Sequence, residues 1–361
     1  MSPEQAKRSF ANRPVPAILY SYWRGRIYAI LGLLVFLVIV VTLATTIGSV
    51  DIPFLTVFSI TLSKLPLVDI TPSWTNAWET IVLEMRLPRV ILAGVVGAAL
   101  AIAGATYQGL FRNPLADPYL IGVAQGAALG AVIGFLLPVA GMGIGTVPLF
   151  AFAGALVSVA VVYSLARVGG TLPVTTLILA GVALGALFSA IVSYLVITSG
   201  AKMPGIIFWL IGSFSLSQWS EVQVVLPIVV VGVVVIMLFA RSLNIMQLDE
   251  EQAQQLGINV ERLKLILLTA ATLITAAAVS FVGIIGFIGI IIPHAVRLLW
   301  GPDYRFLLPL SVISGAIFLI LADVVARTIL APSEIPTGVV TALCGAPFFL
   351  YLLRRRTKML F

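Results

Sequence analysis

The chain has 361 residues, of which 60% are hydrophobic and 10% are charged, with a formal net charge of +7. A soluble domain carries roughly 25% charged residues, so this composition excludes a chain that faces water on all sides. A single cysteine, Cys344, and a single histidine, His294, exclude an intrachain disulfide and a metal cluster of those residue types. We expect an integral membrane protein with no metal site and no cofactor.

The apolar segments are continuous runs of about 20 residues, which is the length of an α-helix that crosses a bilayer. They do not alternate with a period of two, and this excludes an outer-membrane β-barrel. The sequence therefore predicts an all-α polytopic membrane protein with about ten transmembrane helices. In chain order we place the helices at residues 28–49, 88–108, 118–137, 147–167, 174–198, 222–240, 264–283, 286–299, 306–327 and 338–353.

The predicted organisation has three parts: a cytoplasmic segment at 1–27, a transmembrane domain at 28–353 and a basic cytoplasmic tail at 354–361. The first apolar run is too long for a signal peptide and has no clear cleavage site, so we expect it to be retained as a helix. The eighth predicted helix is short and rich in glycine, which indicates that it is tilted or broken. Residues 205–214 are too few to cross and are expected near an interface or re-entering.

Orientation follows from the lysine and arginine residues, which accumulate in cytoplasmic loops. With the N-terminus inside, the cytoplasmic segments hold 16 of the 21 basic residues, and an even number of spans returns the C-terminus to the same side. The basic excess is then a topology signal rather than a sign of nucleic-acid binding. We expect a bacterial inner or plasma membrane protein with both termini cytoplasmic. The five basic residues left outside are Lys64, Arg86, Arg89, Lys202 and Arg327.

Small residues recur at intervals of four in several predicted helices. The third helix carries Gly122, Gly126, Gly130 and Gly134, which place four glycines on one stripe. Such a stripe lets two helix backbones approach closely. We interpret it as helix packing first, and a pathway or a dimer interface is the alternative.

Groups that could carry chemistry are scarce. The chain has no Walker-type glycine loop and no nucleophile–base pair, so we expect it not to be an enzyme and to leave ATP hydrolysis to a partner. Asp323 and Arg327 are spaced i, i+4 near the end of the ninth helix, where they are expected to form an ion pair on one face. A proton relay would need more such groups.

The longest polar stretch between helices, residues 241–264, contains a predicted short helix that is suited to docking a partner. Asp249 is placed to cap its start, acidic residues occupy its first turn, and Gly257 can end it in a left-handed conformation. The alternative is a solvated connector. The candidate docking residues are Asp249, Glu250, Glu251, Gln252, Gln255, Leu256 and Gly257.

Several motifs occur in one order between residues 80 and 353, and together they resemble the permease subunits of iron–siderophore, haem and cobalamin ABC importers, the FecCD-type family. The first is Arg86-Leu87-Pro88-Arg89, which precedes a helix of small residues. The further segments that carry the resemblance are 108–118, 179–185, 286–297, 322–327 and 335–347.

The resemblance implies a type II ABC importer permease fold with ten spans per subunit. It implies a homodimer, two cytoplasmic ATP-binding subunits that dock at the 249–257 segment, and an extracytoplasmic substrate-binding protein. Arg86, Arg89 and Arg327 would pair with glutamates of that binding protein, which is consistent with electrostatic steering. The alternatives are snorkelling beside Glu84 for Arg86 and Arg89, and the pair with Asp323 for Arg327.

The resemblance also implies two cytoplasmic gates. Asn113 and Leu115 match the gate between the second and third helices, and Val174 and Thr175 match the one between the fourth and fifth. The family often has small hydroxyl residues at these places, and Val174 departs from that pattern. His294 is interpreted as a packing or capping residue before a haem ligand.

The leading hypothesis is therefore the permease of a binding-protein-dependent ABC importer for a metal chelate, with siderophore-bound iron, haem and a corrinoid all open as cargo. A secondary carrier that works without an ATPase is the alternative, but it would need intramembrane carboxylates or an ion site. A structural or enzymatic membrane protein is a third class, and the lack of a polar catalytic cluster counts against it.

Overall fold

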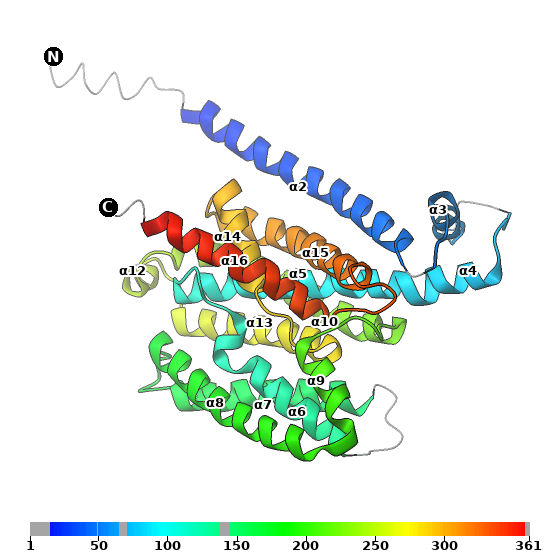
Figure 1. The fold of residues 1–361 in the computed structure, drawn as a ribbon. Coiled ribbons are helices and arrows are strands. Elements are labelled where there is room, and N and C mark those ends of the chain that lie inside the picture. The colour runs from blue at the N-terminus through cyan, green and yellow to red at the C-terminus, as the bar shows by residue number, and fades with distance from the viewer. Residues whose placement is uncertain (1–14, 49, 65–70, 138–144, 358–361) are drawn as a thin grey trace.

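The computed structural model describes residues 15–48, 50–64, 71–137 and 145–357, and the regular structure within them is helical apart from one isolated bridge between Val168 and Thr171. Figure 1 shows most of the helices packed side by side in a bundle, with α2 running obliquely and its start standing away from the others. The elements are α2 Val15–Thr46, α3 Phe54–Ser63, α4 Asn76–Thr80, η1 Ile81–Arg86, α5 Leu87–Phe111, η2 Pro118–Ile121, α6 Val123–Leu136, α7 Thr146–Ala166, α8 Val174–Thr198, η3 Gly200–Lys202, α9 Met203–Ile211, α10 Trp219–Leu238, α11 Ala240–Ile245, α12 Glu250–Gln255, α13 Val260–Val282, α14 Ile288–Trp300, α15 Tyr304–Thr328 and α16 Thr337–Thr357.

Each of the ten predicted transmembrane segments coincides with a helix, and the predicted all-α class is confirmed. Among the described residues, seven helical stretches are long and apolar enough to cross a membrane. The other three predicted segments coincide with shorter apolar helices, α6, α14 and α16. Residues 15–27, which were expected to precede the first span, already belong to helix α2.

Helix α5 lies at the centre of the bundle. In its span 83% of the most apolar stretch is buried, whereas the corresponding value for α2 is 11%. It packs against α15, α13, α14 and α10 (Figure 1). Small residues allow this crowding, because a methyl group at Gly97 would collide with the carbonyl oxygen of Gly315 on α15.

The predicted glycine stripe of the third segment packs α6 against α7. A Cβ atom at Gly130 would overlap the carbonyl oxygen of Phe150, and one at Gly126 would overlap Ser158. On the partner helix, Gly154 faces the carbonyl oxygen of Gly126 in the same way. The stripe therefore serves helix packing within the chain, as its first interpretation predicted.

Helix α14, which corresponds to the eighth predicted segment, is continuous, and the chain leaves the helical conformation just before it, between α13 and α14. Gly283 and Phe287 both have positive φ, at 78° and 72°. The Tyr119 hydroxyl donates to the carbonyl of Ile285 at 3.0 Å, which satisfies one backbone group outside the helices. Residues 205–214 form most of α9 and the turn after it, and α9 contacts α6, α8 and α16.

The bundle has two ends that matter for function. One, called the α12 end here, carries α12 together with the first residues of α2 and the last residues of α16 that the structure describes (Figure 1). The opposite end, called the arginine end, carries η1 and the 332–334 loop. The start of the first helix and the end of the last helix thus lie at the same end, as an even number of crossings requires.

Candidate functional site

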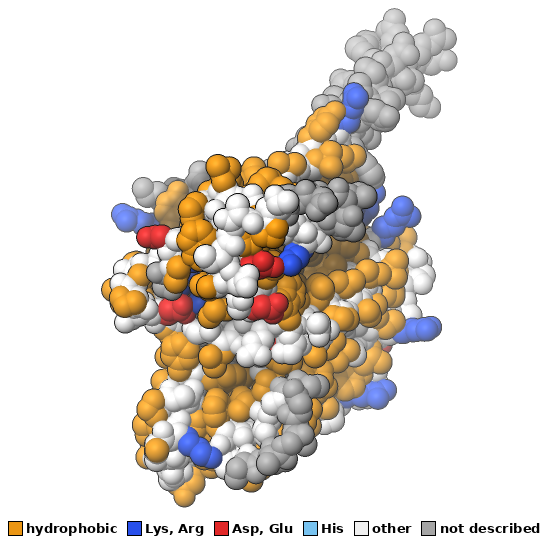
Figure 2. Space-filling view, turned by 90° about the vertical axis from the view of Figure 1, so that its right-hand side faces the viewer, with side chains coloured by type: hydrophobic (Ala, Val, Ile, Leu, Met, Phe, Trp, Pro, Cys, Tyr) orange, Lys and Arg blue, Asp and Glu red, His pale blue; other side chains and the backbone are white. Residues whose placement is uncertain are grey.

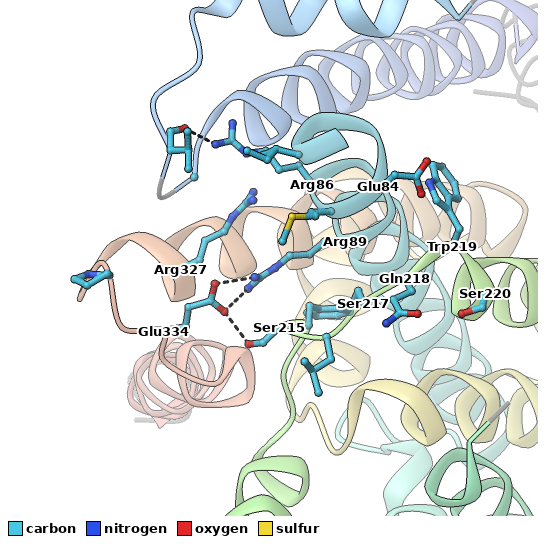
Figure 3. Close-up of a pocket in the computed structure, with 17 residues that line it drawn as sticks. Glu84, Arg86, Arg89, Ser215, Ser217, Gln218, Trp219, Ser220, Arg327 and Glu334 are labelled. Carbon is cyan, nitrogen blue, oxygen red and sulfur yellow. Dashed lines mark hydrogen bonds and ion pairs between the residues drawn. The ribbon is translucent and has the colours of Figure 1, made fainter. Parts of the chain in front are cut away.

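The arginine end contains a cavity of about 800 Å³ into which all three predicted docking arginines project. Its wall is formed by η1 and the start of α5, the loop from Phe214 to Ser220, the end of α15, and the 332–334 loop. Figure 3 shows Arg86, Arg89 and Arg327 converging from two helices above Ser215 and Glu334. Segments that lie far apart in the sequence therefore build one polar chamber.

A local irregularity positions the first two arginines. Pro88 stands at the second position of α5, and a proline ring clashes with the carbonyl four residues earlier, here that of Glu84. The chain accommodates this in a widened π-helical turn, Ile81–Arg86, just before α5. Arg86 and Arg89 then both face the interior of the bundle and are buried.

Arg89 is held by two carboxylates. Its Nε and Nη2 donate to Asp323 at 2.9 and 3.0 Å, and its Nη1 and Nη2 donate to Glu334 at 2.9 and 3.0 Å. Paired contacts of this kind suit the planar guanidinium group and fix its orientation. Thr337 adds a hydrogen bond to Asp323 at 3.2 Å, so helices α5, α15 and α16 meet at this ion pair.

Arg86 and Arg327 bind the end of the first helix. Arg86 donates through Nη1 to the carbonyls of Thr45 and Thr46 at 3.2 and 2.8 Å, and through Nη2 to that of Val50. Arg327 donates through Nη2 to the carbonyl of Ala44 at 2.7 Å. The last carbonyls of a helix lack partners within the helix and carry its negative dipole end, so two cations are favourable there.

These contacts distinguish between the alternative roles that the sequence analysis gave for Arg86, Arg89 and Arg327. Snorkelling of Arg86 and Arg89 beside Glu84 is wrong, because both side chains are buried in the bonds described above and Glu84 is exposed. The predicted i, i+4 pair exists, with Arg327 Nε at 3.7 Å from Asp323 Oδ2. The stronger partner of Asp323 is Arg89, which sequence spacing did not reveal.

The cavity brings charges of both signs together. Arg86, Arg89 and Arg327 line it beside Glu84 and Glu334, and Asp323 pairs with two of the arginines. The Nε of Arg327 is buried without a hydrogen-bond partner among the described residues. In a view onto this end, acidic side chains lie near the middle of the face and most Lys and Arg side chains stand at its edge (Figure 2).

Glu334 connects the cluster to the loop that leads into α10. Its Oε2 accepts a hydrogen bond from the Ser215 hydroxyl at 2.7 Å (Figure 3). Burial alone would raise the pKa of Glu334, but the bonds from Arg89 and Ser215 outweigh it and hold the pKa below its ordinary value. Glu334 is therefore an anion that fastens the 213–215 turn to α5.

At the opposite end, α12 is the helix that was predicted for docking. Its exposed residues include Glu251, Gln252, Gln255 and Leu256, and Gly257 has the expected left-handed φ of 86°. The predicted cap is wrong in one respect: Asp249 stands at the N-cap position, but its side chain binds Arg112 at 2.7 Å instead of a backbone N–H of α12. Glu250 pairs with Lys264 at 2.9 Å.

Both predicted gate segments lie at this same end. Asn113 Oδ1 accepts from the backbone N–H of Leu115 at 3.0 Å, which shapes the turn after α5, and the Leu115 side chain is exposed. Val174 and Thr175 form the first turn of α8, where Thr175 is exposed. His294 packs edge-on against Phe348 of α16, with ring centroids 6.3 Å apart.

Comparison with known proteins finds a transport family and relatives that are named as permease proteins. A sequence model of the FecCD transport family matches residues 34–355. The cobalamin import system permease protein BtuC of Halobacterium salinarum is 44% identical over 278 residues, which cover 77% of this chain and 74% of that protein. The hemin transport system permease protein HmuU of Yersinia pestis is 39% identical over 333 residues, 91% of this chain and 96% of that protein.

The fold has a solved counterpart as well. A structure described as an inward-facing conformation of a metal-chelate type ABC transporter superposes with a TM-score of 0.78 at 32% sequence identity. The match covers 90% of this chain and 98% of the other.

Proposed function

The chain belongs to the FecCD transport family, and from this premise we propose that it is the permease subunit of an ATP-driven importer for a metal chelate. The observation that carries the proposal is the length of the match, which includes residues 34–355 and both ends of the bundle. Relatives of similar identity are named for cobalamin, hemin and ferric citrate, so the proposal names the class of cargo rather than one compound.

The α12 end is proposed to face the cytoplasm and to bind two ATP-binding subunits. Two features support this: the loop that contains α12 presents exposed polar side chains, and 16 of the 21 basic residues belong to sequence segments that the topology prediction assigns to the cytoplasm. The chain itself is proposed to carry out no chemistry on its cargo. Closure of the ATP-binding subunits would move α12 and open the gate segments at 113–115 and 174–175 in turn.

The arginine end is proposed to receive an extracytoplasmic binding protein. Three arginines line its cavity, and the Nε of Arg327 lacks a hydrogen-bond partner among the described residues, so a glutamate of the binding protein has the chemistry to bind there. Arg86 and Arg89 then support the docking site from within, since their donors already have partners in the chain.

We further propose a homodimer that encloses the path. Helix α8 supports this, because only Leu177, Gly181, Gly185 and Val192 on it are buried, as one narrow stripe. The remaining circumference is exposed and mixes large apolar residues with hydroxyl side chains such as Ser189 and Ser193. Such a helix has surface for a second copy and for a passing cargo in addition to lipid.

The test is reconstitution in proteoliposomes with the ATP-binding subunit and the binding protein encoded beside it. Uptake of a labelled siderophore–iron complex, haemin or cobalamin is expected only when ATP and both partners are present. Matched vesicles with a non-hydrolysable ATP analogue provide the control. Uptake that is driven by an ion gradient with this chain alone would replace the proposal by a secondary carrier.

A further inference from the structure

Two consecutive residues at the start of α12 bind two different parts of the chain. Asp249 contacts Arg112, which directly precedes the predicted gate residue Asn113. Glu250 contacts Lys264, which in turn binds Leu172, two residues before Val174. The predicted docking helix is thus connected to both predicted gate segments through adjacent side chains.

The arm through Glu250 centres on a buried lysine. Lys264 Nζ lies 2.9 Å from Glu250 Oε2 and 3.3 Å from both Glu261 Oε1 and the carbonyl oxygen of Leu172. Glu261 Oε2 also accepts the backbone N–H of Leu172 at 3.1 Å, so both backbone polar groups of Leu172 are bound. Only 5% of the Lys264 side chain is exposed, whereas Glu250 and Glu261 are each 35% exposed. The lysine is thus shielded from water on the side of Leu172, which strengthens its bonds there.

The arm through Asp249 is exposed and therefore weaker. Arg112 Nη1 lies 2.7 Å from Asp249 Oδ1 and 3.3 Å from the carbonyl oxygen of Leu248. Exposed ion pairs are screened by solvent and contribute little to stability. Arg112 nevertheless has a constrained backbone, because it ends α5 in the left-handed region with φ of 49°.

Helix α12 needs such connections to transmit force. Among its six residues only Ala253 is buried, so apolar packing barely holds it to the bundle. A short helix that is pushed by a partner would turn about its flanking loops unless polar contacts tied it to its neighbours. The contacts that the structure provides join α12 to Arg112 at the end of α5 and to Lys264 on α13, and through these residues to the two gate segments.

We propose that Asp249 and Glu250 form a two-armed link that passes movement of α12 to both gate segments, with Lys264 as the buried hub. The proposal rests on the function proposed above and adds positioning residues to it. Asp249 acts through Arg112 on the 113–115 turn, and Glu250 acts through Lys264 and Leu172 on the start of α8. The Glu250 arm is the stronger one.

The decisive variant is Glu250→Gln, because it removes the negative charge that Lys264 contacts on α12 and leaves Lys264 paired with Glu261. In proteoliposomes that contain the complete transporter, the cargo imported per ATP hydrolysed is expected to fall at least about fivefold, the lower range of coupling between sites. Capture of the ATP-binding subunit is measured in parallel, and the ratio is compared at equal amounts of assembled complex. Arg112→Gln is expected to lower the same ratio less.

A matched control is Arg262→Gln, which removes from the first turn of α13 one exposed arginine whose side chain makes none of the contacts described above. Its ratio of transport to hydrolysis is expected to equal that of the wild type. Lys264→Arg preserves the hub charge and is expected to retain part of the coupling. The swap Arg112→Asp with Asp249→Arg is expected to restore the exposed arm.

A second measurement tests the link through a distance within the protein and does not depend on transport. Spin labels at positions 171 and 254, both exposed, report the distance between the gate loop and α12 in the assembled complex after Cys344→Ser. In the wild type this distance is expected to stay narrow and equal with ATP and with ADP, and in Glu250→Gln it is expected to broaden.

The outcomes separate the two proposals. If the wild type shows no ATP-dependent uptake, the proposed function fails. If the wild type transports and Glu250→Gln has the same transport per ATP and the same distance, the link is overturned. Reduced capture of the ATP-binding subunit with an unchanged ratio also overturns it, because Glu250 would then act in docking alone.

Discussion

Arg89 and Asp323 stand 234 residues apart in the sequence and form a paired ion contact, with Nε–Oδ2 and Nη2–Oδ1 distances of 2.9 and 3.0 Å. Asp323 is 1% exposed, so its negative charge is stabilised by its protein partners rather than by water. The contact ties α5 to α15, and Glu334 and Arg327 extend it to the α16 loop and to the end of α2. The proposed docking surface is thus also a structural joint.

Asp323→Asn tests the joint, because it retains the shape and removes the charge. Breaking one partner of a buried ion pair leaves an uncompensated charge and costs roughly 3–5 kcal/mol. We expect the free energy of unfolding to fall by that amount, as measured by titration with a denaturing detergent. The control is Glu79→Gln, which breaks the exposed pair with Lys64 and is expected to change nothing measurable. Equal stability of the two variants would contradict the joint.

Glu334 predicts a definite dependence on pH. Its pKa is lowered in the folded protein, so the folded state favours the anion, and its stabilising effect is present above the unfolded pKa of about 4.3 and is lost as the pH falls below it. The difference in melting temperature between wild type and Glu334→Gln is therefore expected to be constant from about pH 8 to pH 5 and to shrink below about pH 4. A difference that vanishes already between pH 7 and pH 5 would contradict the assignment.

Much of the fold could be predicted from the sequence, because long apolar runs leave the backbone few options in lipid. The segment predicted at 174–198 is the observed α8, and the family that the ordered motifs indicated is confirmed. The glycines near the eighth segment indicated an irregularity, but the observed α14 is continuous and the irregular backbone precedes it. The sequence analysis began the first helix at residue 28, but α2 begins at Val15. The hydrophobic pattern marks only the apolar part of a helix, and the first residues of α2 include polar ones.

The site could be predicted less completely, because its bonds join distant residues. The pair of Asp323 and Arg327 follows from i, i+4 spacing, but nothing local reveals that Arg89 is the closer partner. Glu334 was missed, although it is the lone carboxylate in the loop between α15 and α16, next to a predicted motif. Asp249 was expected to cap α12, and Arg112, which belongs to another segment, takes its carboxylate instead.

The glycine stripe of α6 predicts that added volume is harmful at one position and harmless at another. In Gly130→Ala the methyl group would collide with the carbonyl oxygen of Phe150, and overpacking of this kind costs about 1–3 kcal/mol. Gly205 is also helical, but a Cβ there meets no atom within 4 Å. Gly205→Ala is therefore expected to be neutral or slightly stabilising. Thermal unfolding of both variants in the same detergent checks this difference.

Arg327 carries the last prediction, because its side chain lines the cavity and its buried Nε lacks a hydrogen-bond partner among the described residues. Arg327→Gln is expected to weaken binding of the cognate binding protein about tenfold or more, since a desolvated charge pair is lost. Arg327→Lys keeps the charge and is expected to retain most of the affinity. The control Lys64→Gln removes one cation outside the cavity and is expected to alter binding little. Equal affinities of Arg327→Gln and wild type in nanodiscs, with both proteins folded, would remove the docking role of Arg327.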